Sequence, residues 1–184
     1  YGNPLLLLLA TAQLQAFEHR VGEPRGSKPA FQHPVFVHRP ILIEENTAPA
    51  PVRKIYDEIK RTLGFPLVAT DFRALARWPD FLGMYWGVLK SIAESPVYAE
   101  CQSGVRESAW TLASELPVPL ELTSEKLLEA GMDPDEVASV VRITELFVKL
   151  LSAQVLNIAL AKIGMEGGNR AGALSTEDRP HRAA

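Results

Sequence analysis

One carboxylate in the sequence stands where it could do chemistry. Asp71 follows the apolar and small residues Val68, Ala69 and Thr70, at the point where a helical pattern begins. An ionised carboxylate in apolar surroundings is costly unless it is paired or used in a reaction. Aspartate is also among the residues most favoured as the N-terminal cap of a helix. Two interpretations of Asp71 therefore stay open, a helix cap and a general base in an apolar pocket.

The sequence lacks the other common catalytic patterns. The four histidines are scattered, no spacing typical of a metal site occurs, and there is neither a glycine-rich phosphate loop nor a dinucleotide fingerprint. A Gly-x-Ser-x-Gly nucleophile motif is missing too. What remains is the carboxylate of Asp71, which could take a proton from water as a general base. We expect no metal and no cofactor.

The segment that carries Asp71 is similar to a known family. The ten residues from Thr70 to Pro79, followed by Phe81-Leu82 and Trp86, resemble the signature of the group I 2-haloacid dehalogenases. Residues 56–64 resemble the helix that precedes this signature in the family. The resemblance covers most of residues 51–165, with a further match at the first seven residues.

This resemblance implies a fold and a reaction. Family members are all-helical and consist of two homologous repeats around a pseudo-two-fold axis, with the active site between the repeats. They hydrolyse short 2-haloalkanoic acids, both D and L, to 2-hydroxy acids with inversion at C2. An aspartate activates the water that attacks directly, and no covalent intermediate forms.

The resemblance also implies roles for individual residues. Asp71 would be the general base, and Asn3 would hold the hydrolytic water. Asn3 is equally well explained as a helix cap before Pro4, so both interpretations stay open. Thr70 matches a small hydroxyl residue that helps to bind the substrate carboxylate. The predicted substrate-binding residues are Thr70, Phe72, Phe147 and Leu151.

The elements that must position these residues are helices. Apolar residues recur with a period near 3.6, and proline, serine, threonine, aspartate and glycine mark the ends of the periodic segments. This pattern predicts an all-α helical bundle. The expected helices cover residues 3–20, 51–63, 71–78, 79–93, 96–116, 123–130 and 133–165.

The expected domain organisation follows the two-repeat family. Residues 1–20 would be the last helix of the first repeat, and residues 21–50, which are rich in proline and glycine, would be the linker between the repeats. Residues 51–166 would form the second repeat, which carries Asp71, and residues 167–184 would be a flexible tail. We therefore expect the chain to be the C-terminal part of a longer two-repeat protein.

Composition restricts the partners. The chain has 184 residues, of which 47% are hydrophobic, and this is sufficient for one domain with a sizeable core. Its formal net charge of −3 argues against nucleic acid as a partner. The apolar run from Leu5 to Leu9 is too short to span a membrane. Cys101 is the single cysteine, so we expect a cytoplasmic protein.

The expected partners are a small 2-haloacid substrate and water. The apolar first and last helices would also allow a homodimer. Two alternatives to the dehalogenase remain: a non-catalytic helical domain that dimerises, with Asp71 only a cap, and a divergent hydrolase of another small acid.

Overall fold

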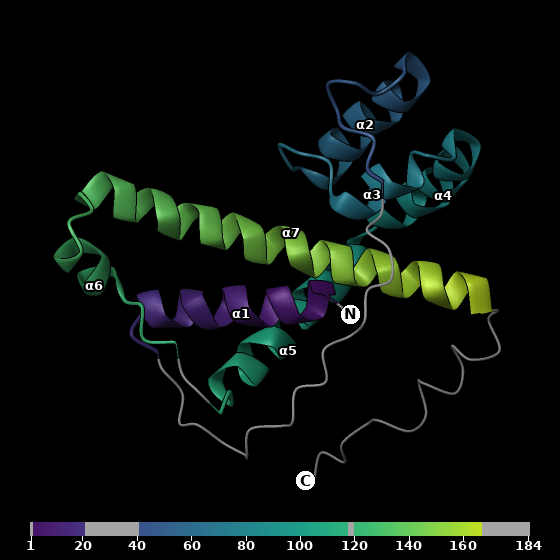
Figure 1. Ribbon diagram of the computed structural model, residues 1–184. Helices are drawn as coiled ribbons and strands as arrows, with labels where there is room; N and C mark the ends of the chain where they lie inside the picture. Colours follow the sequence, from purple (N-terminus) through teal and green to yellow (C-terminus); the bar gives the residue numbers. More distant parts are fainter. Residues whose placement is uncertain (1, 21–40, 118–119, 167–184) are drawn as a thin grey trace, which may run out of the picture.

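The computed structural model of this chain describes residues 2–20, 41–117 and 120–166. These residues form seven α-helices and no strand, so the predicted all-α fold is confirmed. The helices are α1 (Gly2–Phe17), α2 (Ala50–Leu63), α3 (Thr70–Leu75), α4 (Pro79–Ala93), α5 (Pro96–Ser114), α6 (Ser124–Glu129) and α7 (Pro134–Glu166). Figure 1 shows them arranged along the long helix α7.

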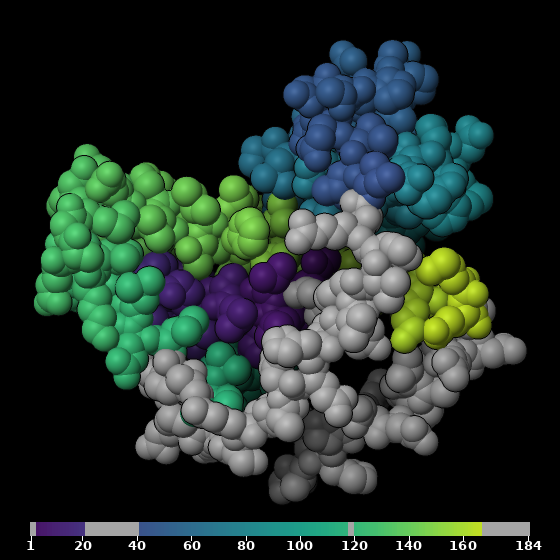
Figure 2. Space-filling view, viewed as in Figure 1, coloured from purple at the N-terminus to yellow at the C-terminus, as the bar shows by residue number. Residues whose placement is uncertain are grey.

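Helices α2, α3 and α4 form a lobe with its own apolar core. Its centre is Phe72, which is completely buried and contacts the ring of Trp86 edge to face, with 6.0 Å between ring centroids. The core also includes Tyr56, Ile59, Val68, Leu82 and Leu89. The lobe projects from the layer formed by α1 and α7 (Figure 2). Phe72 thus fixes α3 between its two larger neighbours.

A second core lies between α1, α5 and α7. It contains Leu7 and Leu14 from α1, Ala109 from α5, and Val148 and Leu151 from α7. These three helices contact one another pairwise, and α6 packs on the N-terminal part of α7. Helix α7 therefore belongs to the second core and also runs beneath the lobe (Figure 1).

Most helix boundaries are close to those predicted, and side-chain capping interactions are found at the starts of α5, α6 and α7. Ser95 Oγ accepts the backbone N–H of Tyr98 at the start of α5, and Thr123 caps α6 in the same way. At the start of α7, Asp133 Oδ1 accepts the N–H of Glu136, while the Glu136 carboxylate accepts the N–H of Asp133. This reciprocal pair is a capping box with aspartate in place of serine or threonine.

Three local predictions were wrong. Helix α1 begins at Gly2 and ends at Phe17, before the predicted end at residue 20, because the chain takes a positive φ of 56° at His19. Helix α5 ends at Ser114 rather than 116. Helix α3 covers Thr70–Leu75 rather than 71–78. Its cap is Ala69, with an extended backbone and no side-chain hydrogen bond, so the N-cap interpretation of Asp71, one of the two left open, is excluded.

The predicted domain boundaries stay predictions. The proposed tail at 167–184 lies outside the described residues, and so do residues 21–40 of the proposed linker.

Helix α7 is long and apolar enough to cross a membrane by length and composition alone, a test that the core helix of a soluble protein passes equally well. Within the described residues, α7 contacts α1, α5 and α6, and 39% of its most apolar window is buried.

Candidate active site

A short connector carries the chain to Asp71 and is held in place by Glu45. Glu45 Oε1 accepts the backbone N–H of Val68 at 2.8 Å, and Oε2 accepts a hydrogen bond from Lys60 Nζ at 2.7 Å. Within α3, the carbonyl of Arg73 accepts a hydrogen bond from the backbone N–H of Ile43. The start of α3 is therefore fixed by the segment that precedes α2.

The Asp71 carboxylate points into the protein. It is the second residue of α3, and its Oδ1 accepts a hydrogen bond from Gln154 Nε2 of α7 at 3.2 Å. The other oxygen, Oδ2, is buried and has no hydrogen-bond partner among the described residues. A carboxylate with one held and one free oxygen can accept a proton at the free oxygen.

Burial dominates the electrostatics of this carboxylate. Desolvation raises the pKa of Asp71 above its usual value, although the hydrogen bond from Gln154 and the backbone N–H groups of Phe72 and Asp71 act in the opposite direction. A raised pKa makes the ionised form a stronger base. Perturbed carboxylates of this kind occur preferentially at functional sites.

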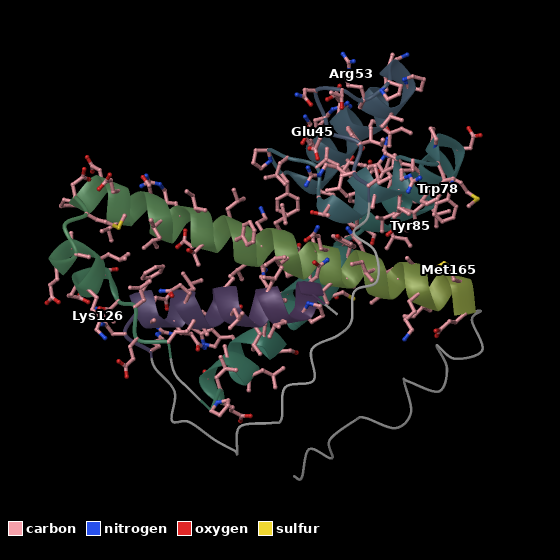
Figure 3. All side chains as sticks on the ribbon, in the orientation of Figure 1. Glu45, Arg53, Trp78, Tyr85, Lys126 and Met165 are labelled. Atoms are coloured by element: carbon pink, nitrogen blue, oxygen red, sulfur yellow. The ribbon has the colours of Figure 1, made fainter. Side chains whose placement is uncertain are left out.

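A second amide and two tyrosines lie close to Asp71. Asn157, one turn after Gln154 on α7, accepts a hydrogen bond at Oδ1 from the Tyr98 hydroxyl at 2.7 Å. The Tyr85 hydroxyl donates to the backbone carbonyl of Asn157 at 3.1 Å. Figure 3 shows Tyr85 at the edge of the lobe nearest to α7. Asn157 Nδ2 is buried with no partner in the described part of the chain. The cluster therefore keeps one free acceptor, on Asp71, and one free donor group.

The two tyrosine hydroxyls are held in the neutral form. Burial raises the pKa of Tyr98 to about 12, and the hydrogen bond to Asn157 only partly offsets this increase. Burial also raises the pKa of Tyr85, and the negative charge of Asp71 adds to the shift in both residues. At neutral pH, both tyrosines therefore act as hydrogen-bond donors and not as bases.

The structure places Thr70 and Phe72 directly beside Asp71, but in different surroundings. Thr70 is exposed, and its Oγ1 accepts a weak hydrogen bond from Arg73 at 3.4 Å. Phe72 is completely buried in the core of the lobe and leaves no surface free. Thr70 can reach a ligand from solvent, whereas Phe72 supports α3 from within.

The remaining predicted residues lie on α1 and α7. The side chain of Asn3, in the first turn of α1, is partly buried and makes no hydrogen bond to another described residue. Phe147 is 45% exposed, and Leu151 packs in the second core against α1 and α5. No hydrogen bond joins Asn3 to Asp71 within the described residues, so their shared role stays a prediction.

Sequence reasoning missed Gln154, which contacts Asp71, and Asn157 beside it. The two residues lie three positions apart in an otherwise apolar part of α7. Two buried amides at this spacing share a helix face, and this was the signal available in the sequence. Tyr85 gave no such signal, since an aromatic residue on an apolar helix face is ordinarily a core residue.

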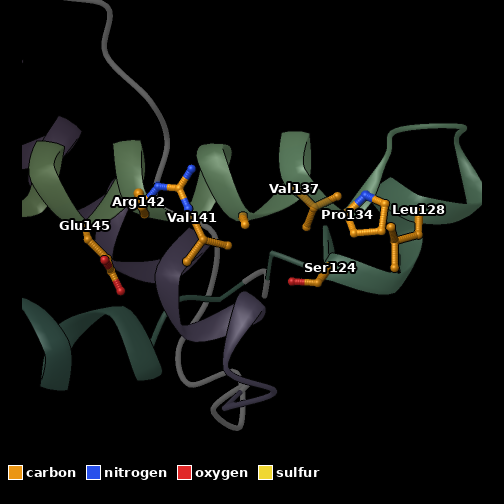
Figure 4. A pocket seen from close by; sticks show the side chains of 8 residues that line it. Ser124, Leu128, Pro134, Val137, Val141, Arg142 and Glu145 are labelled. Carbon is orange, nitrogen blue, oxygen red and sulfur yellow. The ribbon is translucent and has the colours of Figure 1, made fainter.

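Two of the grooves on the described surface lie apart from this cluster. One of about 650 Å³ is lined by α1, α5 and α7, including Pro4 beside Asn3, and its walls are mostly apolar. The other, of about 420 Å³, lies between α6 and α7 and includes Arg142 and Glu145 (Figure 4). Neither groove includes Asp71 among its lining residues. Among the described residues, no group of three or more histidine, cysteine, aspartate or glutamate side chains could hold a metal ion.

Comparison with known proteins relates the chain to one group of enzymes. No family model matches it. It is 29% identical over 164 residues to an (R)-2-haloacid dehalogenase of Pseudomonas putida, covering 86% of this chain and 54% of that protein. It is 34% identical over 124 residues to an (R)-2-haloacid dehalogenase of Rhizobium sp. (strain NHG3), covering 66% of this chain and 48% of that protein.

Solved structures agree with the sequence comparison. A D-2-haloacid dehalogenase in complex with L-LA superimposes with a TM-score of 0.77 at 29% identity, covering 86% of this chain and 56% of that one. A mutant in complex with D-2-CPA gives a TM-score of 0.72. The chain spans about half the length of the relatives that it matches. Sequence and structure thus both relate this chain to the 2-haloacid dehalogenase family, as the segment around Asp71 predicted.

Proposed function

We propose that this chain carries the catalytic carboxylate of a hydrolase that converts short 2-haloalkanoic acids to 2-hydroxy acids. The observation that carries the proposal is the buried Asp71 carboxylate, held at Oδ1 and free at Oδ2. The named activity of the relatives, (R)-2-haloacid dehalogenase, supplies the substrate class.

The proposed reaction is direct hydrolysis. Asp71 Oδ2 takes a proton from water while the water oxygen bonds to C2 of the haloacid, and the carbon–halogen bond breaks with both its electrons leaving on the halide. The halide needs no acid to help it depart, so a single base suffices. Attack opposite the leaving group inverts the configuration at C2, and no ester to Asp71 forms.

Other residues would hold the reactants. Asn3 would orient the water, and Thr70, which is exposed next to Asp71, would bind the substrate carboxylate. Phe147 presents a partly exposed ring on the same helix as Gln154. Positioning of this kind supplies much of the rate of a hydrolase, because the reacting atoms must approach within about 3–3.5 Å of each other.

The proposal is tested by measuring chloride released from D- and L-2-chloropropionate by a protein that includes both of the repeats that the resemblance implies, because the active site is expected to lie between them. We expect chloride release from at least one isomer, and lactate of inverted configuration. Asp71→Asn should lower the rate on the order of 100-fold or more, because an amide cannot accept the proton.

Asp80→Asn is the matched control. It makes the same chemical change nine residues along, at an exposed position in the first turn of α4. It should leave chloride release close to that of the unmodified chain. Equal rates for Asp71→Asn and the unmodified chain, or no chloride from either isomer with a folded protein, would contradict the proposal.

A further inference from the structure

The side chain of Gln154 joins two parts of the fold at the candidate active site. Its Nε2 donates to Asp71 Oδ1 at 3.2 Å across a sequence separation of 83 residues. The pair connects the middle of α7 to the first turn of α3. Among the described residues, it is the one side-chain hydrogen bond that Asp71 receives.

The surroundings of Gln154 would suit an apolar residue. Gln154 is 5% exposed, and the preceding residue, Ala153, is 2% exposed and packs against Phe65 and Leu150. A buried amide is unfavourable unless its hydrogen bonds are made, and here the Nε2 group donates to the Asp71 carboxylate. A leucine at this position would pack without that requirement. The amide is therefore explained by what it does to Asp71.

Contacts from two other helices fix the part of α7 that carries Gln154. Asn157 is held by the hydroxyl of Tyr98 on α5 and by that of Tyr85 on α4. Its position three residues after Gln154 places the two amides on the same side of the helix. Rotation of α7 about its axis would break both tyrosine contacts. These contacts therefore fix the backbone at Gln154 independently of its hydrogen bond to Asp71.

We propose that Gln154 is the positioning residue of Asp71: it holds Oδ1, so that Oδ2 alone faces the proton that is removed from water. The effect of Gln154 on catalysis rests on the proposed function, whereas its hydrogen bond to Asp71 does not. Gln154 touches no reacting atom in this scheme and acts through Asp71.

Gln154→Met tests the role, since methionine has similar length and no donor. Losing the donor removes a group that stabilises the ionised carboxylate, so the pKa of Asp71 should rise further. The acid limb of the pH profile of kcat/KM should move to higher pH. We expect kcat/KM on its plateau to fall about tenfold or more, because the carboxylate loses its fixed orientation.

Gln102→Met is the matched control. Gln102 also reaches from one helix to α7, where its Nε2 donates to the Lys149 carbonyl at 3.0 Å and to Ser152 Oγ at 3.2 Å. It does not contact Asp71. Its loss should leave the position of the acid limb unchanged.

A second readout does not depend on activity. The titration of the Asp71 carboxyl is followed by carbon NMR, with the signal assigned by its loss in Asp71→Asn. The titratable groups that face Asp71 from neighbouring helices are Tyr85 and Tyr98, and both stay neutral in the acid range. The midpoint should move to higher pH in Gln154→Met and not in Gln102→Met.

The outcomes separate the two proposals. An unchanged midpoint in Gln154→Met would overturn the positioning role even if chloride is released. A raised midpoint without chloride release from any form would support the contact and overturn the proposed function. If Gln154→Met does not fold, Gln154→Leu carries the same test, because leucine is a good helix former that also lacks a donor.

Discussion

At the residue scale, Asp71 is a local cost to the fold. Its carboxylate is buried, only one of its oxygens has a side-chain partner, and burial raises its pKa. Local destabilisation of this kind is typical of functional sites, because the desolvation that lowers the stability of the fold also makes the carboxylate a stronger base. The surrounding core of Phe72, Trp86 and their neighbours holds the residue in place.

The stability of the chain should reveal this cost as a pH dependence. Because the pKa of Asp71 is raised in the folded state, its bound proton favours folding below the unfolded-state pKa, and this contribution is lost as pH rises through the folded-state pKa. Asp71→Asn cannot ionise. The free energy of unfolding of the variant, minus that of the unmodified chain, should therefore increase from about pH 4 towards neutrality.

Urea unfolding at a series of pH values measures this difference. Taking the difference between two chains cancels the contributions of other carboxylates, such as Glu45 and Glu125, whose pKa values are lowered in the fold. A difference that is constant with pH would show that Asp71 is as well solvated in the folded chain as in the unfolded one.

At the element scale, α3 is a very short helix that depends on its neighbours. It covers only Thr70–Leu75, too few residues for a helix that is stable on its own. Glu45 fixes the connector before it by accepting from Lys60 Nζ and from the N–H of Val68. Tyr56 adds a hydrogen bond from its hydroxyl to the carbonyl of Ile43 in the same segment. The direction of Asp71 therefore depends on a segment almost thirty residues earlier in the chain.

Glu45→Ala should destabilise the chain and loosen α3. It removes the partner of a buried backbone N–H as well as an ion pair, and the loss should be about 1–3 kcal/mol in the free energy of unfolding. The pKa of Glu45 is lowered in the fold, since the contacts with Lys60 and Val68 outweigh the opposing effect of burial. Its contribution is therefore present above the unfolded-state pKa and is lost as pH falls through the lower folded-state pKa.

Asp57→Ala provides the control for this loss. Asp57 pairs with the same lysine at 3.6 Å, but its side chain is 58% exposed. Its removal should cost about 1 kcal/mol or less. Equal effects of the two substitutions in urea unfolding at neutral pH would contradict the structural role of Glu45.

At the scale of the whole molecule, the candidate site lies where two apolar cores meet. The lobe of α2, α3 and α4 supplies Asp71 and Tyr85, and the α1–α5–α7 layer supplies Gln154, Asn157 and Tyr98. Hydrogen bonds across this boundary join the two parts at Asp71–Gln154 and Tyr85–Asn157. Packing of the lobe against α7 therefore builds the polar cluster.

Leu82→Ala should weaken this arrangement from within the lobe. Leu82 is completely buried in the first core, so its truncation should cost about 2–5 kcal/mol in the free energy of unfolding. Met84→Ala, on the same helix at a residue that is 63% exposed, should change stability by about 0.5 kcal/mol or less. Similar midpoints of urea unfolding for the two variants would contradict the assignment of the core.

The sequence by itself determined the all-α class, most helix boundaries and the choice of Asp71 as the residue to examine. Boundaries such as Ser95, Thr123 and Asp133 are set by contacts within one turn, and Pro79 stands at the first helical position that proline favours. The local sequence is therefore sufficient to locate them. Asp71 could be singled out because a charge among apolar residues is costly wherever the chain folds.

Only the tertiary structure decided what Asp71 contacts. The choice between cap and inward-facing carboxylate depended on the extended backbone at Ala69, which the contacts of Glu45 and Phe72 fix. Gln154 and Asp71 are 83 residues apart in the sequence, and they meet because of how α7 packs against the lobe. Short-range patterns carry no information about such a pairing, because it follows from the register of whole helices against one another.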